Sequence, residues 1–406
     1  MIYVGIDVAK NKHDCAAVGS DGNVVLSPFR IKNSLDGYTR LIQRIDDIVS
    51  DRNEVQIGLE DTGPYTVNIA GYLDNLFSVK VINPLFTAKY KKSTTLRKTK
   101  TDSIDAIQIA KMLRIGTNFK PIKRIPYNCE ELKSFVRYRA VLVKERSKTK
   151  TSIKRLIHIL LPELEDMFSD LYCPTVLGFL YEYPGKAALS KCRTPALTKV
   201  LLKSSKGHYG EDMAFRLREA ANNSIGIVSP AKSYVLKETI KHLYYLNEKV
   251  KGLEDTIAEV VHMFNPPILS IPGIGEVAAA TIIGEIGDFN RFNNPDQILA
   301  FAGMSPTIYQ SGKYASIKPM QVNRNSKMEK RGSHSLRSSI YIATRLVCMF
   351  DPNFREYLFK KKKEGKHHYV AISHAAKKLI RLMYALETEH RSYELRPNNK
   401  PKTNKL

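Results

Sequence analysis

The chain of 406 residues carries 64 Lys and Arg against 40 Asp and Glu, a formal net charge of +24. Such an excess repels itself in a compact fold unless a polyanion relieves it, which disfavours an ordinary metabolic enzyme and favours a nucleic-acid partner. The hydrophobic fraction of 43% excludes wholesale disorder, and five scattered cysteines without a CxxC pair disfavour a zinc ribbon or a disulfide framework.

The first region of the chain is predicted to be α/β. Three strands are expected at residues 2–9 (IYVGIDVA), 15–20 (CAAVGS) and 23–31 (NVVLSPFRI), the last two joined by a turn at Asp21-Gly22. A helix over residues 34–49 follows, with Ser34 as its N-cap and one apolar face formed by Leu35, Tyr38, Ile42 and Ile45. A strand at 55–60, a helix at 65–76 and a strand at 79–84 complete a mixed sheet flanked by helices.

The middle of the chain is predicted to be helical. Residues 130–161 indicate one long basic helix that ends before Pro162. Between residues 236 and 264 apolar side chains recur every seven residues with a second set three residues later, which favours a left-handed coiled coil over a helix packed within its own domain. Residues 173–229, interrupted by several prolines, are expected to be irregular.

The last region is predicted to contain helices at 276–286, 295–302, 334–349 and 370–386. PGIG before the first of them favours a helix-hairpin-helix, in which Gly273 and Gly275 let a phosphate approach backbone amides, over a plain turn. From residue 391 the chain is polar, basic and expected to be flexible. The expected domains are 1–118, 119–264 and 265–390, followed by the tail 391–406.

Four acids of the first region are candidates for chemistry. Asp7 lies inside an apolar strand, Glu60 ends another strand, and Asp102 and Asp105 share one face of a predicted helix. A carboxylate in a buried strand is costly unless it is paired or binds a metal. Carboxylate clusters suit Mg²⁺, which can clamp the oxygens of a phosphodiester. Read singly, each acid is also explained as a cap, a strand end or a hydrogen-bonded core residue.

The motifs that carry these acids resemble a known family. GIDVAK, GLEDTG and KTDSIDAIQIA match the acid pattern of a RuvC-like, RNase H-type nuclease domain, and PGIGEVAAATIIGEIGDF with YQSGK and KRGSHSLRSS resembles a C-terminal transposase domain. In this order they resemble the DEDD-type insertion-sequence transposases, the IS110 family, over residues 1–115 and 265–385. The resemblance implies a metal-dependent DNA recombinase guided by a structured RNA of its own element.

The same resemblance implies the roles of the site residues. Asp7, Glu60, Asp102 and Asp105 would bind Mg²⁺ or Mn²⁺, and Ser311 of YQSGK would be the nucleophile, in a site assembled across an oligomer. By itself Ser311 is a serine in a hydroxyl-rich basic loop without an assigned base, although a metal can activate such a nucleophile. Ser305, Thr307 and Ser316 are neighbouring alternatives, and Asp61 must face away from Glu60 because adjacent strand residues alternate.

His334, Arg337 and Tyr341 imitate the residues of tyrosine recombinases. That chemistry needs a well-separated tyrosine and another arginine, whereas these three residues fall on one predicted helix. We therefore interpret His334 and Arg337 as phosphate contacts or as part of a solvated face.

Basic segments border the candidate catalytic motifs. Residues 89–100 hold six Lys or Arg and no acid, residues 120–155 hold twelve against three acids, and Lys360–Lys363 with Lys366 form a third cluster. Each run alone is more typical of a solvated face, but together they favour a nucleic-acid channel. The predicted contacts are Lys92, Arg97, Lys98, Lys100, Arg137, Arg139, Lys148, Lys150, Lys154, Arg155, Gly273, Gly275, Lys313, Arg331 and Arg337.

Three functions are compared on these grounds. The favoured one is an RNA-guided DNA transposase, a prokaryotic, cytoplasmic and nucleoid-associated homo-oligomer (dimer or tetramer) that binds donor and target duplexes. The second is a RuvC-like structure-selective nuclease that hydrolyses DNA with water and does not need Ser311. The third is a non-enzymatic architectural protein. No membrane partner is expected, because the sequence has no run of about 18 uncharged apolar residues.

Overall fold

The computed structural model describes residues 1–82, 84–94, 102–116, 127–305 and 328–395. Within this part the side chains at positions 85, 89, 91, 92, 94, 102, 103, 127 and 128 are not described. The chain forms two compact units, Met1–Ile125 and Pro126–Leu406. Over the described residues, no helix has the length and apolar character needed to cross a membrane.

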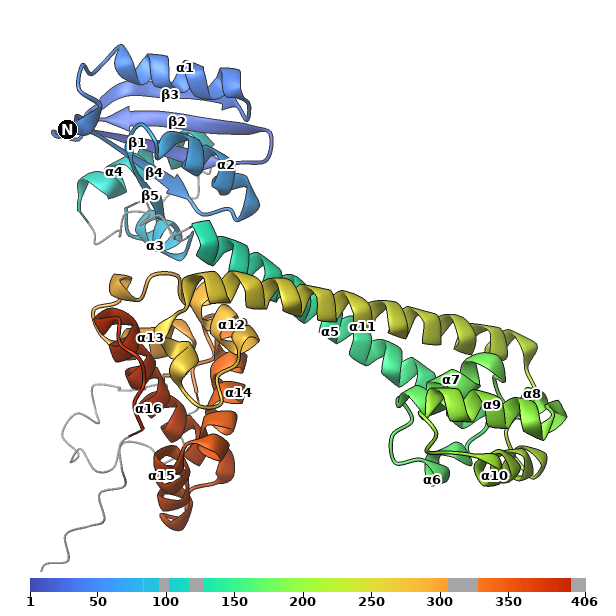
Figure 1. Ribbon diagram of the computed structural model, residues 1–406. Coiled ribbons are helices and arrows are strands. Elements are labelled where there is room, and N and C mark those ends of the chain that lie inside the picture. Colours follow the sequence, from blue (N-terminus) through green and yellow to red (C-terminus); the bar gives the residue numbers. More distant parts are fainter. Residues whose placement is uncertain (83, 95–101, 117–126, 306–327, 396–406) are drawn as a thin grey trace, which may run out of the picture. The chain divides into compact units, whose positions relative to one another are not determined.

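The first unit is built on a five-stranded mixed sheet of order β3-β2-β1-β4-β5 (Figure 1). β1, β2 and β3 form an antiparallel meander, whereas β4 and β5 run parallel to β1. The strands are β1 (Ile2–Val8), β2 (Lys12–Val18), β3 (Val24–Lys32), β4 (Val55–Glu60) and β5 (Ser78–Ile82). This order and polarity confirm the predicted RNase H-type mixed sheet.

Helices α1 (Leu35–Asp46) and α2 (Pro64–Leu73) contribute to the core on one face of the sheet. Ser34 caps α1 as predicted, its hydroxyl accepting the Gly37 amide at 3.2 Å. The prediction that Leu35 lies on the buried face is wrong, since it is 68% exposed. The helix begins at this residue, so its first turn borders an open hollow shared with Tyr72 instead of the sheet.

Helix α4 (Asp102–Arg114) covers the other face of the sheet, where two facing glycines admit it. Gly5 and Gly58 are paired across β1 and β4. A Cβ atom at Gly5 would lie 2.1 Å from the Ala106 carbonyl oxygen, and one at Gly58 would lie 2.6 Å from Leu113. The absence of side chains at both positions therefore sets how closely α4 approaches the sheet.

Two long antiparallel helices, α5 (Tyr127–Leu160) and α11 (Pro230–Phe264), organise the second unit (Figure 1). The heptad residues of α11 are buried or half-buried, and their partner is α5 of the same chain. Ile240 and Val261 are also buried outside the heptad seam, since further helices cover both ends of the pair. The predicted seam thus forms within one chain.

The segment predicted to be irregular, residues 173–229, is mostly helical, so that prediction is wrong. Pro174 and Pro195 lie in the first turns of helices, where proline's missing amide has no helical partner to lose. The helices at this end of the pair are α6 (Leu164–Met167), α7 (Pro174–Glu182), α8 (Lys186–Lys191), α9 (Thr194–Ser204) and α10 (Glu211–Asn222).

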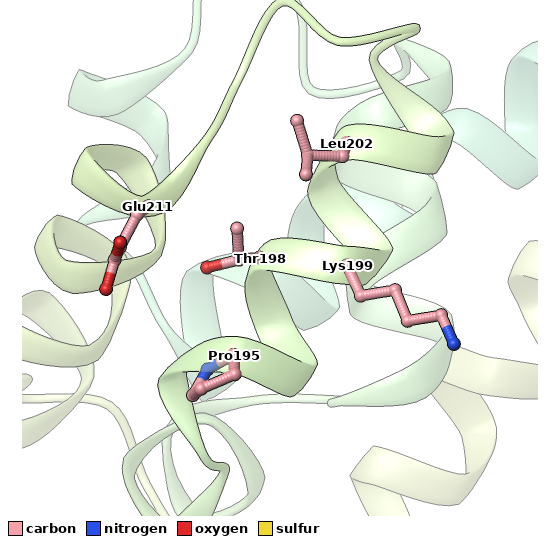
Figure 2. A pocket seen from close by; sticks show the side chains of 5 residues that line it. All are labelled: Pro195, Thr198, Lys199, Leu202 and Glu211. Atoms are coloured by element: carbon pink, nitrogen blue, oxygen red, sulfur yellow. The ribbon is translucent and has the colours of Figure 1, made fainter.

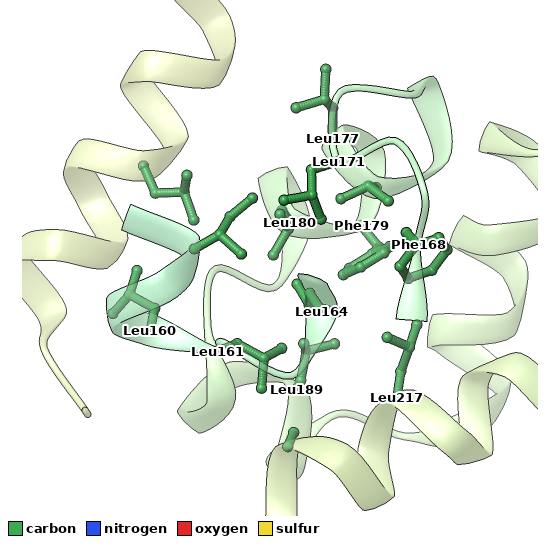
Figure 3. Close-up of a cluster of buried hydrophobic side chains, with 14 of the residues drawn as sticks. Leu160, Leu161, Leu164, Phe168, Leu171, Leu177, Phe179, Leu180, Leu189 and Leu217 are labelled. Atoms are coloured by element: carbon green, nitrogen blue, oxygen red, sulfur yellow. The ribbon is translucent and has the colours of Figure 1, made fainter. Parts of the chain in front are cut away.

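These helices enclose their own apolar core, which Figure 3 shows around Leu164, Phe168 and Phe179. The rings of Phe168 and Phe179 have centroids 5.9 Å apart. An open hollow lies between α9 and α10, lined by Pro195, Thr198, Lys199, Leu202 and Glu211 (Figure 2). Its lining has no convergent set of catalytic groups.

At the opposite end of the pair lies the helical C-terminal part. Its helices are α12 (Glu276–Ile286), α13 (Pro295–Phe301), α14 (His334–Phe350), α15 (Pro352–Lys363) and α16 (His368–Glu389). Four of them match predicted helices closely. The sequence interpretation missed α15, and it missed α3 (Pro84–Thr94) in the first unit because Pro84 was taken as the end of the preceding strand. Both helices open on a proline, which suits the first turn of a helix.

Candidate active site

Asp7 and Glu60 lie at the same edge of the sheet. They directly follow Ile6 and Leu59, the last register pair of the parallel strands β1 and β4. Alternation places them on the face of Gly5 and Gly58, which α4 covers. The carboxyl ends of two adjacent parallel strands thus present two acids on one face.

Helix α4 brings its N-terminal end to this edge. At its C-terminal end, Arg114 donates from Nη1 to the Ser20 carbonyl at 3.3 Å, beyond the strand end that pairs with the start of β1. At its N-terminal end, Ala106 packs on Gly5, and Asp105 beside it is only 6% exposed. Asp102 is the first residue of α4, but its side chain lies outside the described set.

Glu60 is held by a buried threonine. Thr87 of α3 is 3% exposed and its hydroxyl lies 2.7 Å from Glu60 Oε1. Asp61, by contrast, accepts the Gly63 amide at 3.0 Å and is exposed, so it closes the turn before α2. The two adjacent acids therefore make different contacts, as the alternation of side chains along a strand predicts.

The donor set suits a hard divalent cation, since it consists of carboxylate oxygens. Among the side chains that the structure describes, which include Asp7, Glu60 and Asp105 but not Asp102, no three His, Cys, Asp or Glu residues come close enough to hold a metal ion. The described residues therefore provide carboxylate oxygens at one end of the sheet, without forming a metal-binding cluster among themselves.

The sequence interpretation missed Asp14, which lies opposite Asp7 in the β1–β2 register. Asp14 is 7% exposed and is bound by Arg30, whose Nε and Nη2 lie 3.1 and 3.2 Å from its two oxygens. The second strand begins at Lys12, not at the predicted Cys15, and this brings Asp14 into the sheet. KHDCAAV does not alternate between polar and apolar residues, so the sequence carried no period-two signal for this earlier start.

Ser311, with Thr307, Lys313 and Ser316, falls in residues 306–327, outside the described residues. The residues that flank this segment are joined to one another. The Glu329 amide donates to the Ser305 carbonyl at 3.0 Å, and the Lys330 amide donates to the Gly303 carbonyl at 3.1 Å. The chain thus leaves and re-enters the described structure at one place.

The three residues that resemble those of tyrosine recombinases, His334, Arg337 and Tyr341, all lie in α14, as predicted. Arg337 donates from Nη1 to the Ala302 carbonyl at 2.9 Å. Burial raises the pKa of Tyr341, and its hydroxyl has no hydrogen-bond partner among the described residues. A raised pKa disfavours the phenolate that nucleophilic attack would need.

The predicted nucleic-acid contacts fall into three groups: residues outside the described part, residues that contact other side chains of the protein, and exposed residues. Arg97, Lys98, Lys100 and Lys313 lie outside the described residues, as does the Lys92 side chain. Arg139 pairs with Glu254, Lys154 lies 3.3 Å from Glu165, and Lys150 sits 4.8 Å from the Tyr172 ring centroid. Lys148, Arg155 and Arg331 are exposed.

The PGIG segment joins a short 3-10 helix (Pro267–Ser270) to α12. Gly273 has φ +96°, and a Cβ there would lie 2.7 Å from the Leu346 carbonyl carbon, so this glycine packs against the backbone of α14. Gly275 precedes α12 in open space, with no atom within 4 Å of a built Cβ. Of the two predicted phosphate contacts, only Gly275 is open to a ligand in this way.

Arg137 is engaged within the protein. Its Nε and Nη2 donate to the two oxygens of Glu285 at 2.8 and 3.1 Å, and Ser333 donates to the same carboxylate at 2.8 Å. Burial raises the pKa of Glu285, but the hydrogen bonds from Arg137 and Ser333 outweigh it, so its pKa lies below the ordinary value. This cluster joins α5, α12 and the N-cap of α14.

Arg137→Met should lower the free energy of unfolding by about 2–3 kcal/mol at neutral pH, because it strands a buried carboxylate, with water near the half-exposed arginine reducing the cost. The depressed pKa of Glu285 means that its stabilisation is present above the ordinary carboxyl pKa and is lost as pH falls through the folded value. In urea unfolding, the difference in the free energy of unfolding between Arg137→Met and the unaltered protein should therefore shrink at acid pH. Arg139→Met is the control, because its partner Glu254 is more exposed than Glu285. If Arg137→Met lowers the free energy of unfolding equally at neutral and acid pH, the ion pair with Glu285 is not the cause.

An RNase H-type mixed sheet that carries Asp7 and Glu60 at the carboxyl ends of two parallel strands is typical of enzymes that cleave nucleic-acid strands. Residues 4–162 match a family model described as a transposase of the DEDD type of IS110. Residues 265–358 match the transposase family of IS116, IS110 and IS902. The chain belongs to this IS110 family and is a DNA transposase of an insertion sequence.

Relatives match the chain along its whole length. An uncharacterized protein of the insertion element IS116 from Streptomyces clavuligerus is 25% identical over 98% of this chain and 97% of its own. A pilin gene-inverting protein from Moraxella bovis is 22% identical over 97% and 98%. A Thermus thermophilus RuvC structure matches 30% of this chain and 100% of its own at 15% identity, with a TM-score of 0.22.

Proposed function

We propose that this transposase cleaves and exchanges DNA strands with a metal-binding acidic site and a serine nucleophile. The observation that carries the proposal is the common edge at which β1, β4 and α4 place Asp7, Glu60 and Asp105. Asp102, one helical turn before Asp105, belongs to the same end of α4. These four acids are the proposed ligands of Mg²⁺ or Mn²⁺.

Such an ion, when bound, neutralises charge that develops on the scissile phosphate. The protein's own residues prepare the site. Thr87 orients Glu60 by its hydrogen bond, and the Arg30–Asp14 pair keeps a second buried carboxylate beside Asp7 neutralised. Basic segments that flank the acids in sequence would bring DNA to a site that would otherwise repel it.

Ser311 is the proposed nucleophile. Its hydroxyl oxygen would bond to phosphorus as the bond to the leaving sugar oxygen breaks, the hydroxyl losing its proton and the sugar oxygen gaining one. The product is a DNA strand held by phosphoserine. The name of the Moraxella relative supports strand exchange over hydrolysis, because inverting a gene requires that cut strands be rejoined.

The proposed partners are donor and target duplexes and a structured guide RNA, bound by a homo-oligomer in the bacterial cytoplasm at the nucleoid. The large positive charge supports two kinds of nucleic acid on one protein. RNA that copurifies with the protein should be one structured species encoded beside its gene. Sequencing that yields only bulk cellular RNA would argue against guidance.

Glu60→Gln should slow DNA cleavage more than about 100-fold, because even outer-shell partners of a metal contribute about 10–100-fold. Asp61→Asn is the matched control: its side chain faces the Gly63 amide, so cleavage should change by no more than about threefold. Single-turnover cleavage of labelled DNA at several Mg²⁺ concentrations measures both. Equal losses in the two variants would show that Glu60 has no special role.

A further inference from the structure

The turn between α15 and α16 concentrates positive charge. Residues 352–381 hold nine Lys or Arg against two acids, and Lys360–Lys363 fill the last turn of α15. The Lys366 amide donates to the Lys361 carbonyl at 3.4 Å, which folds the turn back onto the helix end. A helix C-terminus favours cations, but its partial charge of about half a unit does not call for a full turn of lysines.

An exposed aromatic cluster adjoins these lysines. Tyr369, in the first turn of α16, is 62% exposed. Its ring centroid lies 5.5 Å from that of His367, 5.6 Å from His368 and 6.2 Å from Tyr341 of α14. The neighbouring rings brace Tyr369 without covering it, so the structure holds an aromatic face open to solvent.

The local potential is positive at this turn. The pKa of His374 is lowered, first by burial and then by the charges of Lys366, Lys361 and Lys377, with Glu364 opposing them. Glu364 is itself paired with Lys361 at 2.9 Å. Positive charge therefore exceeds what the single acid of the turn neutralises.

We propose that the α15–α16 turn is a binding surface for a single-stranded segment of nucleic acid. An unpaired base stacks on Tyr369, and the phosphates on either side of it bind Lys360, Lys363 and Lys366. Duplex bases are stacked on one another and offer no free face, while an acidic protein surface has no need of an aromatic platform. The proposed surface uses none of the residues of the proposed carboxylate and serine site.

The chain contains no tryptophan, so Tyr369→Trp places a single fluorescent reporter on the surface. In the full chain, without divalent metal, a 12-nucleotide oligo(dT) should quench its emission saturably, because a stacked base quenches indole. A 12-base-pair duplex should not. Tyr234→Trp on α11, a 67% exposed position, is the control and should respond to neither. Repeating the titration with oligo(U) and comparing the two dissociation constants shows whether the surface prefers RNA or DNA.

Two further variants test the components. Tyr369→Ala should weaken oligo(dT) binding about tenfold and Tyr369→Phe should restore it, since stacking contributes about 1–3 kcal/mol per base. Lys363→Ala with Lys366→Ala should reduce the salt slope by about 1.4, whereas the pair Lys199→Ala and Lys203→Ala on α9 should leave it unchanged. Unchanged emission of the Tyr369→Trp variant, or equal quenching by the duplex, would overturn the proposal. Because no metal is used, loss of catalysis in other variants does not affect this result.

Discussion

Ser311→Ala should abolish the covalent protein–DNA adduct on a cognate substrate. The change removes one oxygen and leaves the four carboxylates in place, so DNA and metal should bind as before. The adduct is measured as labelled DNA that migrates with the protein on a denaturing gel. Ser305→Ala, at the described flank of the same segment, is the control and should retain the adduct.

The same experiment separates the three functions. A nuclease that uses water would cleave DNA without any adduct and would keep cleaving after Ser311→Ala. An architectural protein would bind DNA independently of divalent metal and would cleave nothing. An adduct that persists in Ser311→Ala but disappears when the acids are changed would show that another residue is the nucleophile.

Gly5→Val should disrupt the first unit. Even a Cβ at this position would lie 2.1 Å from the Ala106 carbonyl oxygen and 2.5 Å from the Ala110 nitrogen, and both are backbone atoms that cannot rotate away. Helix α4 would have to leave the sheet, at a cost of about 3 kcal/mol or more, and would carry Asp105 with it. Thermal unfolding should show the loss, and DNA cleavage should fall to background.

Gly71→Ala is the matched control for that change. Gly71 lies inside α2, and a Cβ there meets no atom within 4 Å. Alanine is favoured over glycine in a helix interior by about 1 kcal/mol, so this variant should be equally stable or more so and fully active. If Gly5→Val unfolds no more readily than Gly71→Ala, α4 does not depend on the close approach.

Local patterns predicted much of the fold. Alternation in VQIGLE predicted β4 with its observed bounds, and Ser34 before an amphipathic segment predicted the N-cap of α1. The heptad spacing from Leu236 predicted the apolar stripe of α11. These features depend on neighbours within a few residues or turns, so their signal is written in consecutive sequence.

Features that depend on distant partners were not predictable in this way. A proline can end a helix or begin one. In residues 173–229, Pro174 and Pro195 begin helices that pack into the core around Phe179. Arg137 resembled any other charge of a basic helix until α12 placed a buried carboxylate beside it. Asp14 lies opposite Asp7 only because β2 pairs with β1 in this register, which the consecutive sequence does not show.

The sequence by itself determined the class of partner and most helices and strands, and its motifs indicated the candidate acids. Charge excess, spacing and alternation are properties of the chain alone. Only the tertiary structure decided that Asp7, Glu60 and Asp105 share an edge, because that depends on α4 crossing the sheet at Gly5 and Gly58. It likewise decided which cations are neutralised internally, since a buried charge takes a partner wherever the fold supplies one.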